Sequence, residues 1–550
     1  MKGLPREARE NELVAVDLEM YGMSSPDKND GTFAGMSFAF ENGDTYLITD
    51  QPDIRPALER VSKGKWVMQN ALFDLKVLRR YATIKQRYIH DTMLVEQDLF
   101  GGWFSRFDLQ NLSRRWLSQR MDKEVRTQFS KATSMTPEME HYAIQDALTT
   151  VRIAQKQIEY IKTELDGNFS WYYDIDEPAL WAILDMKPPR VDVDAWLKHT
   201  QTVKDEAAGL EAELGFNVYS HKTVKEKIEA ALNRKIRSTN ANSVLLPLLT
   251  RLNPDHEAAK LIRAILEVRQ ARKAVETYGE KWIEQHVDSK GYVHPSYKVT
   301  GAETGRMACA KPNMHNIPAR RMPIFRTFFP ASVGNVLQVA DVSQQEPGFS
   351  ALMSQDPVLM DEMERGVKGY TVMQELFNVD YDTAKVIYLG LNYGMSAFGL
   401  APAANISLDA AEEGMKARAR RYRGMTIWQE DMETYARRNF QVLTVTGRPV
   451  WVNPYNDQWR RNAVNGPIQG SAADHTKLAF ILNHRFCAAD NMPFCVTGVI
   501  HDEILQDVPK EEAEFYRGVM QDAWDEASKR LAPGIPMRIE VKQGENWGVK

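Results

Sequence analysis

The sequence predicts a multidomain protein that combines α/β and α+β architecture. The chain has 550 residues, which is too long for one hydrophobic core, so two to four domains are expected. In its first part, strand-like patterns alternate with helical patterns, which favours an α/β sheet. In its last part, two strand-like patterns reach acidic residues at one end. Acidic residues at strand ends are therefore the first candidates for a functional site.

The composition limits the class of protein. Hydrophobic residues make up 43% of the chain and charged residues 26%, as in ordinary soluble proteins. The net charge of −5 gives no global signal for nucleic acid, so any DNA-binding surface must be local. Three cysteines are too few for a disulfide framework, which favours a reducing compartment. With no apolar signal region and no run of about 20 apolar residues, a soluble, cytoplasmic protein without a membrane partner is expected.

The N-terminal part predicts strands and helices that carry acidic residues. Residues 13–19 alternate as a strand does, and the period of two places Asp17 and Glu19 on one face. A second strand pattern over 65–70 is followed by helical spacing over 72–80. Thr136-Pro137 predicts a helix start, because proline is tolerated in the first turn. The four acids on these elements are Asp17, Glu19, Asp74 and Asp146.

Four carboxylates from different elements can converge at one edge of a sheet. Two divalent cations about 3.5–4 Å apart activate water and stabilise the leaving oxygen in phosphodiester hydrolysis, and they need several acidic ligands. A single acid is more often a solvated surface group, so the interpretation depends on the ordered set. Tyr142 precedes Asp146 by four residues and shares its helix face.

The middle of the chain predicts a helical arm. Residues 194–287 are charged and helical in period, with a polar interruption over 233–242. Long polar helices with a basic tip suit a lever that lies on a phosphate backbone, and a solvated helical linker is the alternative.

The last part predicts a hairpin with charge at its tip. Residues 495–500 and 504–508 have strand patterns, and His501-Asp502-Glu503 lies between them. Hairpins usually turn through residues that accept positive φ, such as Asn-Gly, and His-Asp-Glu does not offer that. Because adjacent carboxylates repel each other, a divalent cation is the leading candidate to compensate their charge. A second strand pattern, over 336–343, reaches Asp341.

Three segments resemble, in order, the polymerase motifs of family A DNA polymerases. They are Asp341-Val342-Ser343-Gln344-Gln345-Glu346, residues 385–399, and His501-Asp502-Glu503. The N-terminal acids with Tyr142 resemble the RNase H-like 3′→5′ proofreading exonuclease of the DEDD type. The resemblance implies an exonuclease domain over 1–165 and a right-hand polymerase domain over 166–550. Within the latter it implies a thumb near 190–290, a palm near 291–350 and 440–550, and fingers near 351–439.

The resemblance assigns the catalytic residues. Asp341 and Asp502, with the backbone carbonyl of Val342, are expected to bind two Mg²⁺ ions. The exonuclease centre is expected to bind two more through Asp17, Glu19, Asp74 and Asp146, and Mn²⁺ can substitute at either centre. Tyr142 is expected to orient the attacking water, with the neighbouring His141 as the alternative that a related subclass suggests. Asn70 and Asp91 also fall on positions that can support this site.

The resemblance also assigns contacts to substrates. Lys385 is expected to neutralise charge on the triphosphate, and Glu346 to exclude the ribose 2′-hydroxyl. The nucleotide-binding residues are Val342, Gln344, Glu346, Lys385, Leu389 and Tyr393. The contacts to primer–template DNA are Arg306, Asn316, Arg326, Arg461, Asn465, Gln469 and His501.

The fingers segment departs from the family pattern. Lys385, Leu389 and Tyr393 recur every four residues along one predicted helix, which includes Gly390 and Gly394. Position 381 is tyrosine where the family has an arginine that grips phosphate. The cations expected to replace it are Arg365, Lys368 or Arg420.

The expected function is template-directed DNA synthesis from deoxynucleoside triphosphates with proofreading. The exonuclease motif begins within twenty residues of the start, which leaves no room for the family's 5′-nuclease domain and suggests a monomeric phage replication enzyme whose replisome partners are unknown. The alternatives are a single-subunit RNA polymerase and a nucleic-acid-binding scaffold that retains only nuclease activity.

Overall fold

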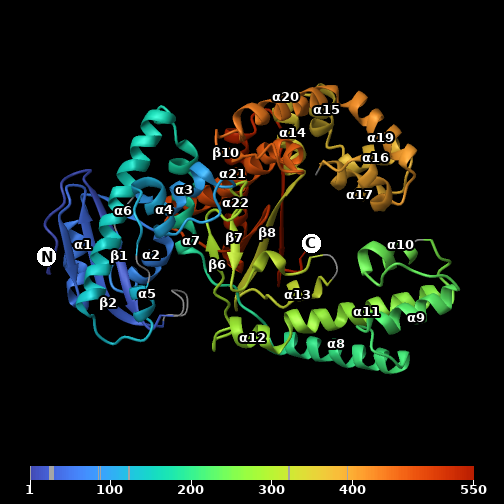
Figure 1. Ribbon diagram of the computed structural model, residues 1–550, viewed down its shortest axis with the longest axis horizontal. Coiled ribbons are helices and arrows are strands. Elements are labelled where there is room, and N and C mark those ends of the chain that lie inside the picture. The colour runs from blue at the N-terminus through green and yellow to red at the C-terminus, as the bar shows by residue number, and fades with distance from the viewer. Residues whose placement is uncertain are drawn as a thin grey trace. The chain divides into compact units, whose positions relative to one another are not determined.

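The computed structural model describes residues 2–549 except 24–29, 85, 87, 122–123, 250, 320–321 and 393 (Figure 1). The chain forms two compact units. The first comprises Met1–Lys187, Pro295–Asn316 and Gln338–Gln543, and the second comprises Pro188–His294, Ile317–Leu337 and Gly544–Lys550. Within the part of the chain that is described, no helix combines the length and apolar character needed to cross a bilayer.

The first unit begins with a five-stranded mixed sheet in the order β3-β2-β1-β4-β5. Its strands are β1 (Leu13–Tyr21), β2 (Thr32–Phe40), β3 (Thr45–Ile48), β4 (Lys65–Met68) and β5 (Ile89–Asp91). The central strand β1 pairs antiparallel with β2 and parallel with β4, so its residues are held from both sides. The strand expected over 65–70 ends at Met68, because Asn70 adopts left-handed backbone angles of φ 63° and ψ 53°.

Helices accompany this sheet. They are α1 (Ile54–Arg60), α2 (Ala71–Leu78), α3 (Thr92–Phe100), α4 (Leu109–Leu117), α5 (Glu124–Gln128) and α6 (Pro137–Glu164). The helix start predicted at Thr136-Pro137 is confirmed, since the Thr136 hydroxyl accepts a hydrogen bond from the Met139 amide at 3.3 Å. Small side chains such as Ala147 and Ala154 let α6 pack closely on Ala15 and Ala39 of the sheet.

A four-stranded sheet in the order β11-β12-β8-β13 forms the second core of the first unit. Its strands are β8 (Asn335–Ser343), β11 (Val496–Ile500), β12 (Glu503–Pro509) and β13 (Arg538–Gly544). Buried glutamines tie its middle together, since Gln506 donates to Gln338 at 2.8 Å and Gln338 donates to Gln543 at 3.0 Å. Two helices that pack on each other accompany it, α21 (Trp459–Ala489) and α22 (Ala513–Leu531).

The predicted hairpin is present, with a tighter turn than expected. Strand pairing continues to Ile500 opposite Glu503, so only His501 and Asp502 form the turn. His501 adopts φ 59°, the positive value that a two-residue hairpin turn requires. The expectation that this tip does not offer positive φ was therefore wrong at His501.

The helices between β8 and α21 form a layered group, drawn in gold and orange in Figure 1. They are α14 (Gln345–Ser354), α15 (Pro357–Arg365), α16 (Gly369–Phe377), α17 (Tyr381–Asn392), α18 (Ala397–Ala404), α19 (Leu408–Arg421) and α20 (Arg423–Asn439). The helix expected to include Gly394 ends at Asn392, and Gly394 lies in the following turn with φ +69°. The placement of Gly394 inside a helix was therefore wrong, whereas Gly390 is helical.

Shorter elements complete the first unit. They are the π-helix Trp171–Asp176, α7 (Glu177–Asp185), the pair β6 (Ser296–Lys298) and β7 (Ala308–Ala310), and the pair β9 (Gln441–Leu443) and β10 (Pro449–Trp451). The β9-β10 hairpin packs on α21 through Val442 and Val450, and Gly466 leaves room for both side chains.

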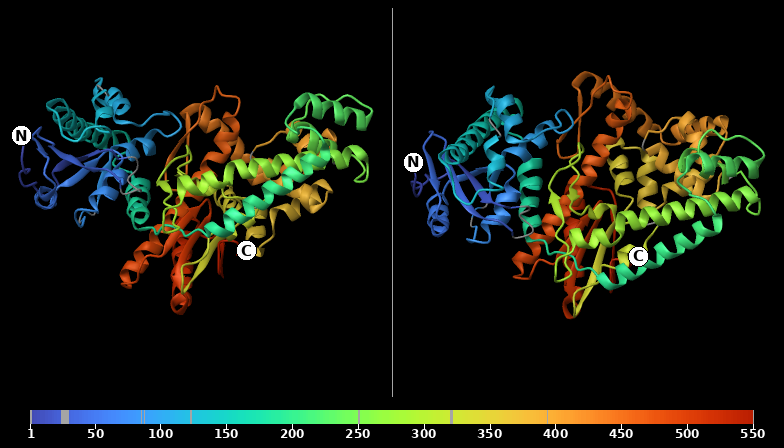
Figure 2. Two further views of the ribbon diagram at one scale, coloured as in Figure 1. Left: turned by 90° about the horizontal axis from the view of Figure 1, so that it is seen from below. Right: turned by 60° about the horizontal axis from the view of Figure 1, so that its bottom comes forward.

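The second unit is mainly helical. Its helices are α8 (Val193–Leu214), α9 (His221–Leu232), α10 (Leu246–Leu249), α11 (Glu257–Tyr278), α12 (Glu280–His286) and α13 (Ile324–Thr327). The long helices α8 and α11 lie side by side in both views of Figure 2 and share an aliphatic core that includes Ile262 and Ile265. Helix α9 ends at Leu232, next to the polar interruption predicted over 233–242.

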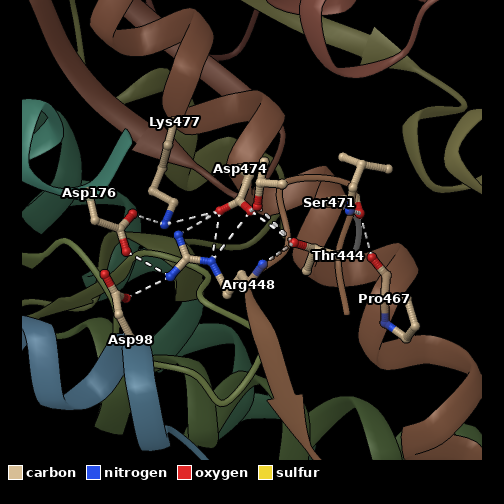
Figure 3. Close-up of polar contacts among 10 residues, drawn as sticks. Asp98, Asp176, Thr444, Arg448, Pro467, Ser471, Asp474 and Lys477 are labelled. Atoms are coloured by element: carbon tan, nitrogen blue, oxygen red, sulfur yellow. Dashed lines mark hydrogen bonds and ion pairs between the residues drawn. The ribbon is translucent and has the colours of Figure 1, made fainter. Parts of the chain in front are cut away.

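A buried ionic cluster joins α3 to the β9-β10 hairpin and α21 (Figure 3). Arg448 donates to Asp98 at 2.6 Å, to Asp176 at 2.8 Å and to Asp474 at 2.8 Å. Lys477 also pairs with Asp176. All five side chains are at most 2% exposed. Residues distant in sequence are thus fixed to one another through the interior of the first unit.

Candidate active sites

Three carboxylates converge at the centre of the five-stranded sheet. Asp17 and Glu19 extend from the same face of β1, and Asp146 lies on the first half of α6. One ligand oxygen from each lies within 4.8 Å of the others. The two neighbours of β1 in the sheet and the close packing of α6 hold these acids together.

The carboxylates of this centre are buried and crowded together, and the Arg126 charge offsets only part of the effect on their pKa values. Burial raises the pKa of Asp17 to about 7, and the Asp146 carboxylate adds to the effect. Burial, then Asp17 and Asp146, raise the pKa of Glu19 well above its usual range. Asp17 Oδ2 is buried and has no hydrogen-bond partner among the residues with described positions. Crowded, buried carboxylate oxygens of this kind fit a divalent cation.

Asp74 is the fourth predicted ligand of this centre. It lies on the first turn of α2 and is buried. Burial, and then the charges of Asp17 and Glu19, raise its pKa well above the usual range. It is not one of the three acids whose ligand atoms lie within 4.8 Å of one another. Its charge nevertheless acts on the same centre.

Asp91 supports the position of Asp74. Its carboxylate accepts hydrogen bonds from the amides of Asn70 at 2.9 Å and Ala71 at 2.8 Å, at the start of α2. It also accepts from the Met93 amide at 3.0 Å and so caps α3. Asp91 thereby fixes the left-handed turn at Asn70 from which α2 begins.

Tyr142 faces the acids and His141 does not. Burial, followed by the charge of Asp146 and a hydrogen bond with it, raises the pKa of Tyr142. The Tyr142 ring also packs against Phe129, with centroids 6.2 Å apart. His141, one position earlier on α6, is exposed. The helix geometry thus favours Tyr142 over His141 as the group beside the carboxylates.

The second candidate centre lies where β8 and the β11-β12 hairpin meet. The sheet places β12 next to β8, and Asp502 lies in the turn that leads into β12. Burial and the adjacent Glu503 raise the pKa of Asp502, Glu346 adds to this, and Arg306 opposes it. Asp341 lies near the end of β8 and is exposed. The joint binding of ions by Asp341 and Asp502 stays a prediction.

Glu346 and Arg306 form an ion pair at this centre. Glu346 lies in the first turn of α14, directly after β8. Gln344 is the residue just before the helix; its φ is 59°, and its Oε1 accepts a hydrogen bond from the Gly369 amide at 3.2 Å. The backbone of Val342 continues β8 up to this turn, and its side chain is buried.

A small pocket lies between α14, α17, α19, α20 and α21. It is lined by Glu346, Ser350, Asn392, Arg418, Met425, Gln429, Val464, Asn465, Ile468 and Gln469. Asn465 is 7% exposed, and its Nδ2 has no hydrogen-bond partner in the described part of the chain. The pocket therefore brings the predicted nucleotide contact Glu346 together with the predicted DNA contacts Asn465 and Gln469, and it offers an unused donor.

Arg418 is a pocket residue that the sequence reasoning missed. Burial lowers its pKa, and the pocket also holds Asn392. Arg418 follows the buried Ala411 and Gly414 at helical spacing, which is the signal that could have identified it. The expected substitutes are not among the residues that line this pocket: Arg365 pairs with Asp361 at 2.9 Å, and Lys368 and Arg420 are exposed.

On helix α17, Lys385 is half-buried and Leu389 is 38% exposed. Tyr381 is exposed and lies against Tyr370, with ring centroids 5.1 Å apart. Tyr393 lies outside the described residues. Gly394, which follows it, approaches the Arg461 side chain: a Cβ there would lie 3.5 Å from Arg461 Cβ.

The other predicted DNA contacts differ in accessibility. Arg461, Asn316 and His501 are exposed, and the His501 ring lies 4.9 Å from that of His315. Arg326, in the second unit, is 5% exposed, and its guanidinium carbon lies 4.3 Å from the Trp547 ring centroid. This burial does not present Arg326 to a duplex, so we leave it out of the DNA interface.

Family models match both parts of the chain. The family model described as DNA polymerase family A matches residues 193–549, and the model described as 3′-5′ exonuclease matches residues 1–159. DNA polymerase I of Aquifex aeolicus is 25% identical over 545 residues, which cover 92% of each chain. DNA polymerase I of Caldicellulosiruptor bescii is 30% identical over 409 residues, 68% of this chain and 47% of that protein.

A solved structure shares the fold. The POL domain of Pol1 from M. smegmatis, in complex with DNA primer-template and dNTP, superposes with a TM-score of 0.81 at 22% identity. The match covers 98% of this chain and 96% of that one. The chain thus spans nearly all of the Aquifex relative and of this structure, and about half of the Caldicellulosiruptor relative.

Proposed function

Because this chain belongs to DNA polymerase family A, we propose that it copies a DNA template from deoxynucleoside triphosphates and excises mispaired 3′ ends. The observation that carries the proposal is the pocket shared by Glu346, Asn465 and Gln469, beside the ion pair of Glu346 with Arg306. The separate acid centre of Asp17, Glu19 and Asp146 supports the 3′→5′ exonuclease activity. The proposed domains are 1–165 for the exonuclease and 166–550 for the polymerase, acting as a monomer in the cytoplasm.

The proposed substrates follow from the side chains available. Glu346, held by Arg306, limits the space for a ribose 2′-hydroxyl. Asn465 and Gln469 offer amide groups to the base edges of the primer–template, and minor-groove acceptors lie at nearly the same places in every base pair. Lys385 and Arg418 supply positive charge for the triphosphate. A role in phage replication stays a prediction, and the relatives named above are bacterial.

Both centres would hold divalent cations, and we propose Mg²⁺, with Mn²⁺ as a substitute. Asp341, Asp502 and the Val342 carbonyl would bind the ions of the polymerase centre, two in number. Two more would be held by the exonuclease acids, Asp17, Glu19, Asp74 and Asp146. When bound, such ions polarise the attacking oxygen and stabilise the leaving oxygen.

Tyr142 is proposed to position the attacking water in the exonuclease centre. We expect Tyr142→Phe to lower the excision rate of a mispaired primer end by about 10²-fold, the scale of a lost positioning or proton-transfer group. His141→Phe, one residue away and exposed, should leave the rate within about twofold of wild type. Single-turnover excision assays measure both. A larger loss in His141→Phe than in Tyr142→Phe would reverse the assignment.

One experiment tests the proposed function as a whole. Wild type should extend a matched primer with Mg²⁺ and deoxynucleotides, and should trim a mismatched primer before extending it. Asp341→Ala should trim without extending, and Asp17→Ala should extend without trimming. If Asp341→Ala still extends primers, or if wild type incorporates ribonucleotides as readily as deoxynucleotides, the proposal is wrong.

A further inference from the structure

An exposed aromatic surface lies where α3 meets the β9-β10 hairpin, and we call its residues Trp103, Phe440 and Tyr455 the junction platform. Trp103 is 49% exposed and Tyr455 is 86% exposed. The Phe440 ring links them, with its centroid 6.3 Å from that of Trp103 and 6.5 Å from that of Tyr455. A contiguous patch of exposed aromatic rings is a candidate binding surface.

Arginines flank the platform residues along the chain. They are Arg437 and Arg438 in the last turn of α20, and Arg460 and Arg461 in the first turn of α21, all of them exposed. The guanidinium carbons of Arg437 and Arg460 lie 5.1 and 5.5 Å from the Trp459 ring centroid. Glu433 pairs with Arg460 at 3.6 Å, and Asp457 is exposed nearby in sequence. Positive charge interleaved with aromatic faces suits the phosphates and bases of an unpaired nucleic acid strand.

Contacts with Trp451 support the Trp103 side of the platform. The Trp451 indole N–H donates to the Leu99 carbonyl at 2.8 Å, and its ring lies 5.1 Å from Trp103. One residue before Leu99, Asp98 accepts a hydrogen bond from Arg448 in the buried ionic cluster. The Trp103 ring is therefore supported before any ligand arrives, which lowers the entropic cost of stacking a base on it.

Helix α21 connects the platform with the polymerase pocket. Gln469 and Asn465 line the pocket beside Glu346, and Arg461 lies one turn further toward the helix start. From Gln469 to Trp459 is ten residues, or about 15 Å of helix. A template strand that contacts Asn465 and passes Arg461 would next meet Tyr455.

We propose that the junction platform stacks the unpaired nucleotides of the template strand ahead of the primer terminus. This proposal rests on the proposed polymerase function, because only a polymerase brings such a strand to α21. Stacking uses the base faces alone, so the platform would accept any sequence.

Binding measurements on two primer–templates test the proposal. One carries a template overhang of one nucleotide and the other an overhang of eight. Wild type should bind the long overhang more tightly than the short one, and Tyr455→Ala should lower that gain by about tenfold, the scale of one lost base–aromatic stack. Affinity for the short overhang should not change. Tyr455→Phe should restore the gain, and Tyr88→Ala, at a Tyr that is 63% exposed on the same unit, should not affect it.

Fluorescence and alternative substrates identify the strand. A 2-aminopurine in the overhang should be quenched on binding to wild type and not to Tyr455→Ala. The proposal is overturned if Tyr455→Ala still binds the long overhang more tightly than the short one by the full wild-type ratio. It is also overturned if the substitution affects only the binding of a displaced non-template flap or a frayed primer end. Primer extension by wild type on the same substrates reports the polymerase function separately. The stacking proposal can therefore fail while the polymerase proposal holds.

Discussion

Replacing Asp502 with asparagine is expected to lower the rate of primer extension by about 10³-fold or more. Enzymes that lose one group stabilising charge in the transition state typically slow by about 10²- to 10³-fold, and Asp502 is expected at the upper end of that range. Asparagine keeps the size of the side chain and removes the negative charge that the proposed cations need. The exonuclease centre lies on a different sheet, so excision should remain within about twofold of wild type. Single-turnover extension and excision on one substrate measure both rates.

Stability separates this catalytic loss from unfolding. Burial and Glu503 raise the pKa of Asp502, which means that its charged form is disfavoured in the folded protein. Removing that charge should leave the thermal midpoint of the metal-free protein unchanged or slightly higher. Glu503→Gln is the matched control at the adjacent position and should cost about 10- to 100-fold, as expected for a group that supports a ligand. Extension by Asp502→Asn within tenfold of wild type would remove Asp502 from the catalytic set.

Elements with a regular local pattern could be predicted from the sequence. Strand β1 alternates with period two, and this alternation places Asp17 and Glu19 on one face. The start of α6 follows from Thr136-Pro137, whose capping geometry is local. Both predictions depend on neighbours a few residues apart, and such neighbours are visible in a sequence.

Positions decided by tertiary contacts could not be predicted in this way. The buried state of Arg326 depends on Trp547, more than two hundred residues later. Helix α17 ends before Gly394, which adopts a positive φ. Glycine accepts both positive and negative φ, so the residue type alone does not show where the helix ends. Arg418 and Arg420 have the same side chain, and only the packing of α19 shows which of them enters the pocket. For these residues the sequence gives the chemical group, but it does not show whether the side chain is buried, exposed or directed into the pocket.

The buried ionic cluster is the extreme case, because Arg448 and Asp98 are 350 residues apart. Two cations, Arg448 and Lys477, face three aspartates, so the cluster is neutral if Asp98 and Asp176 share one proton. Burial and the neighbouring Asp176 raise the pKa of Asp98 well above its usual range. Burial would also raise the pKa of Asp176, but Arg448 and Lys477 outweigh it and lower that pKa. A neutral Asp98 that donates to Asp176 leaves Arg448 and Lys477 facing the anions of Asp176 and Asp474.

The protonated state of Asp98 also explains an otherwise unsatisfied atom. Asp98 Oδ2 is buried, and as a carboxylate oxygen it has no hydrogen-bond partner among the described parts of the chain. As a hydroxyl it can donate to Asp176. The amide of asparagine can make the same donation while its oxygen still accepts from Arg448. Asp98→Asn should therefore mimic the native cluster.

Removing Arg448 is expected to have the largest effect on stability. We expect Arg448→Met to lower the free energy of unfolding of the first unit by about 3–5 kcal/mol, because it leaves buried aspartates without their cation. Asp176→Asn should cost a similar amount, since it removes a charged partner of both Arg448 and Lys477. Asp98→Asn should cost less than about 1 kcal/mol. Arg530→Met, at an exposed pair with Glu526, should cost at most about 1 kcal/mol.

Denaturant unfolding monitored by circular dichroism measures the four variants under one set of conditions. The informative comparison is between the two aspartates, because both contact Arg448, whereas only Asp176 also pairs with Lys477 and is expected to be ionised. If Asp98→Asn destabilises as much as Asp176→Asn, then Asp98 is ionised and the shared proton does not exist. If Arg448→Met costs no more than Arg530→Met, water or a rearranged Lys477 compensates the aspartates, and the cluster does not hold α3 to the β9-β10 hairpin.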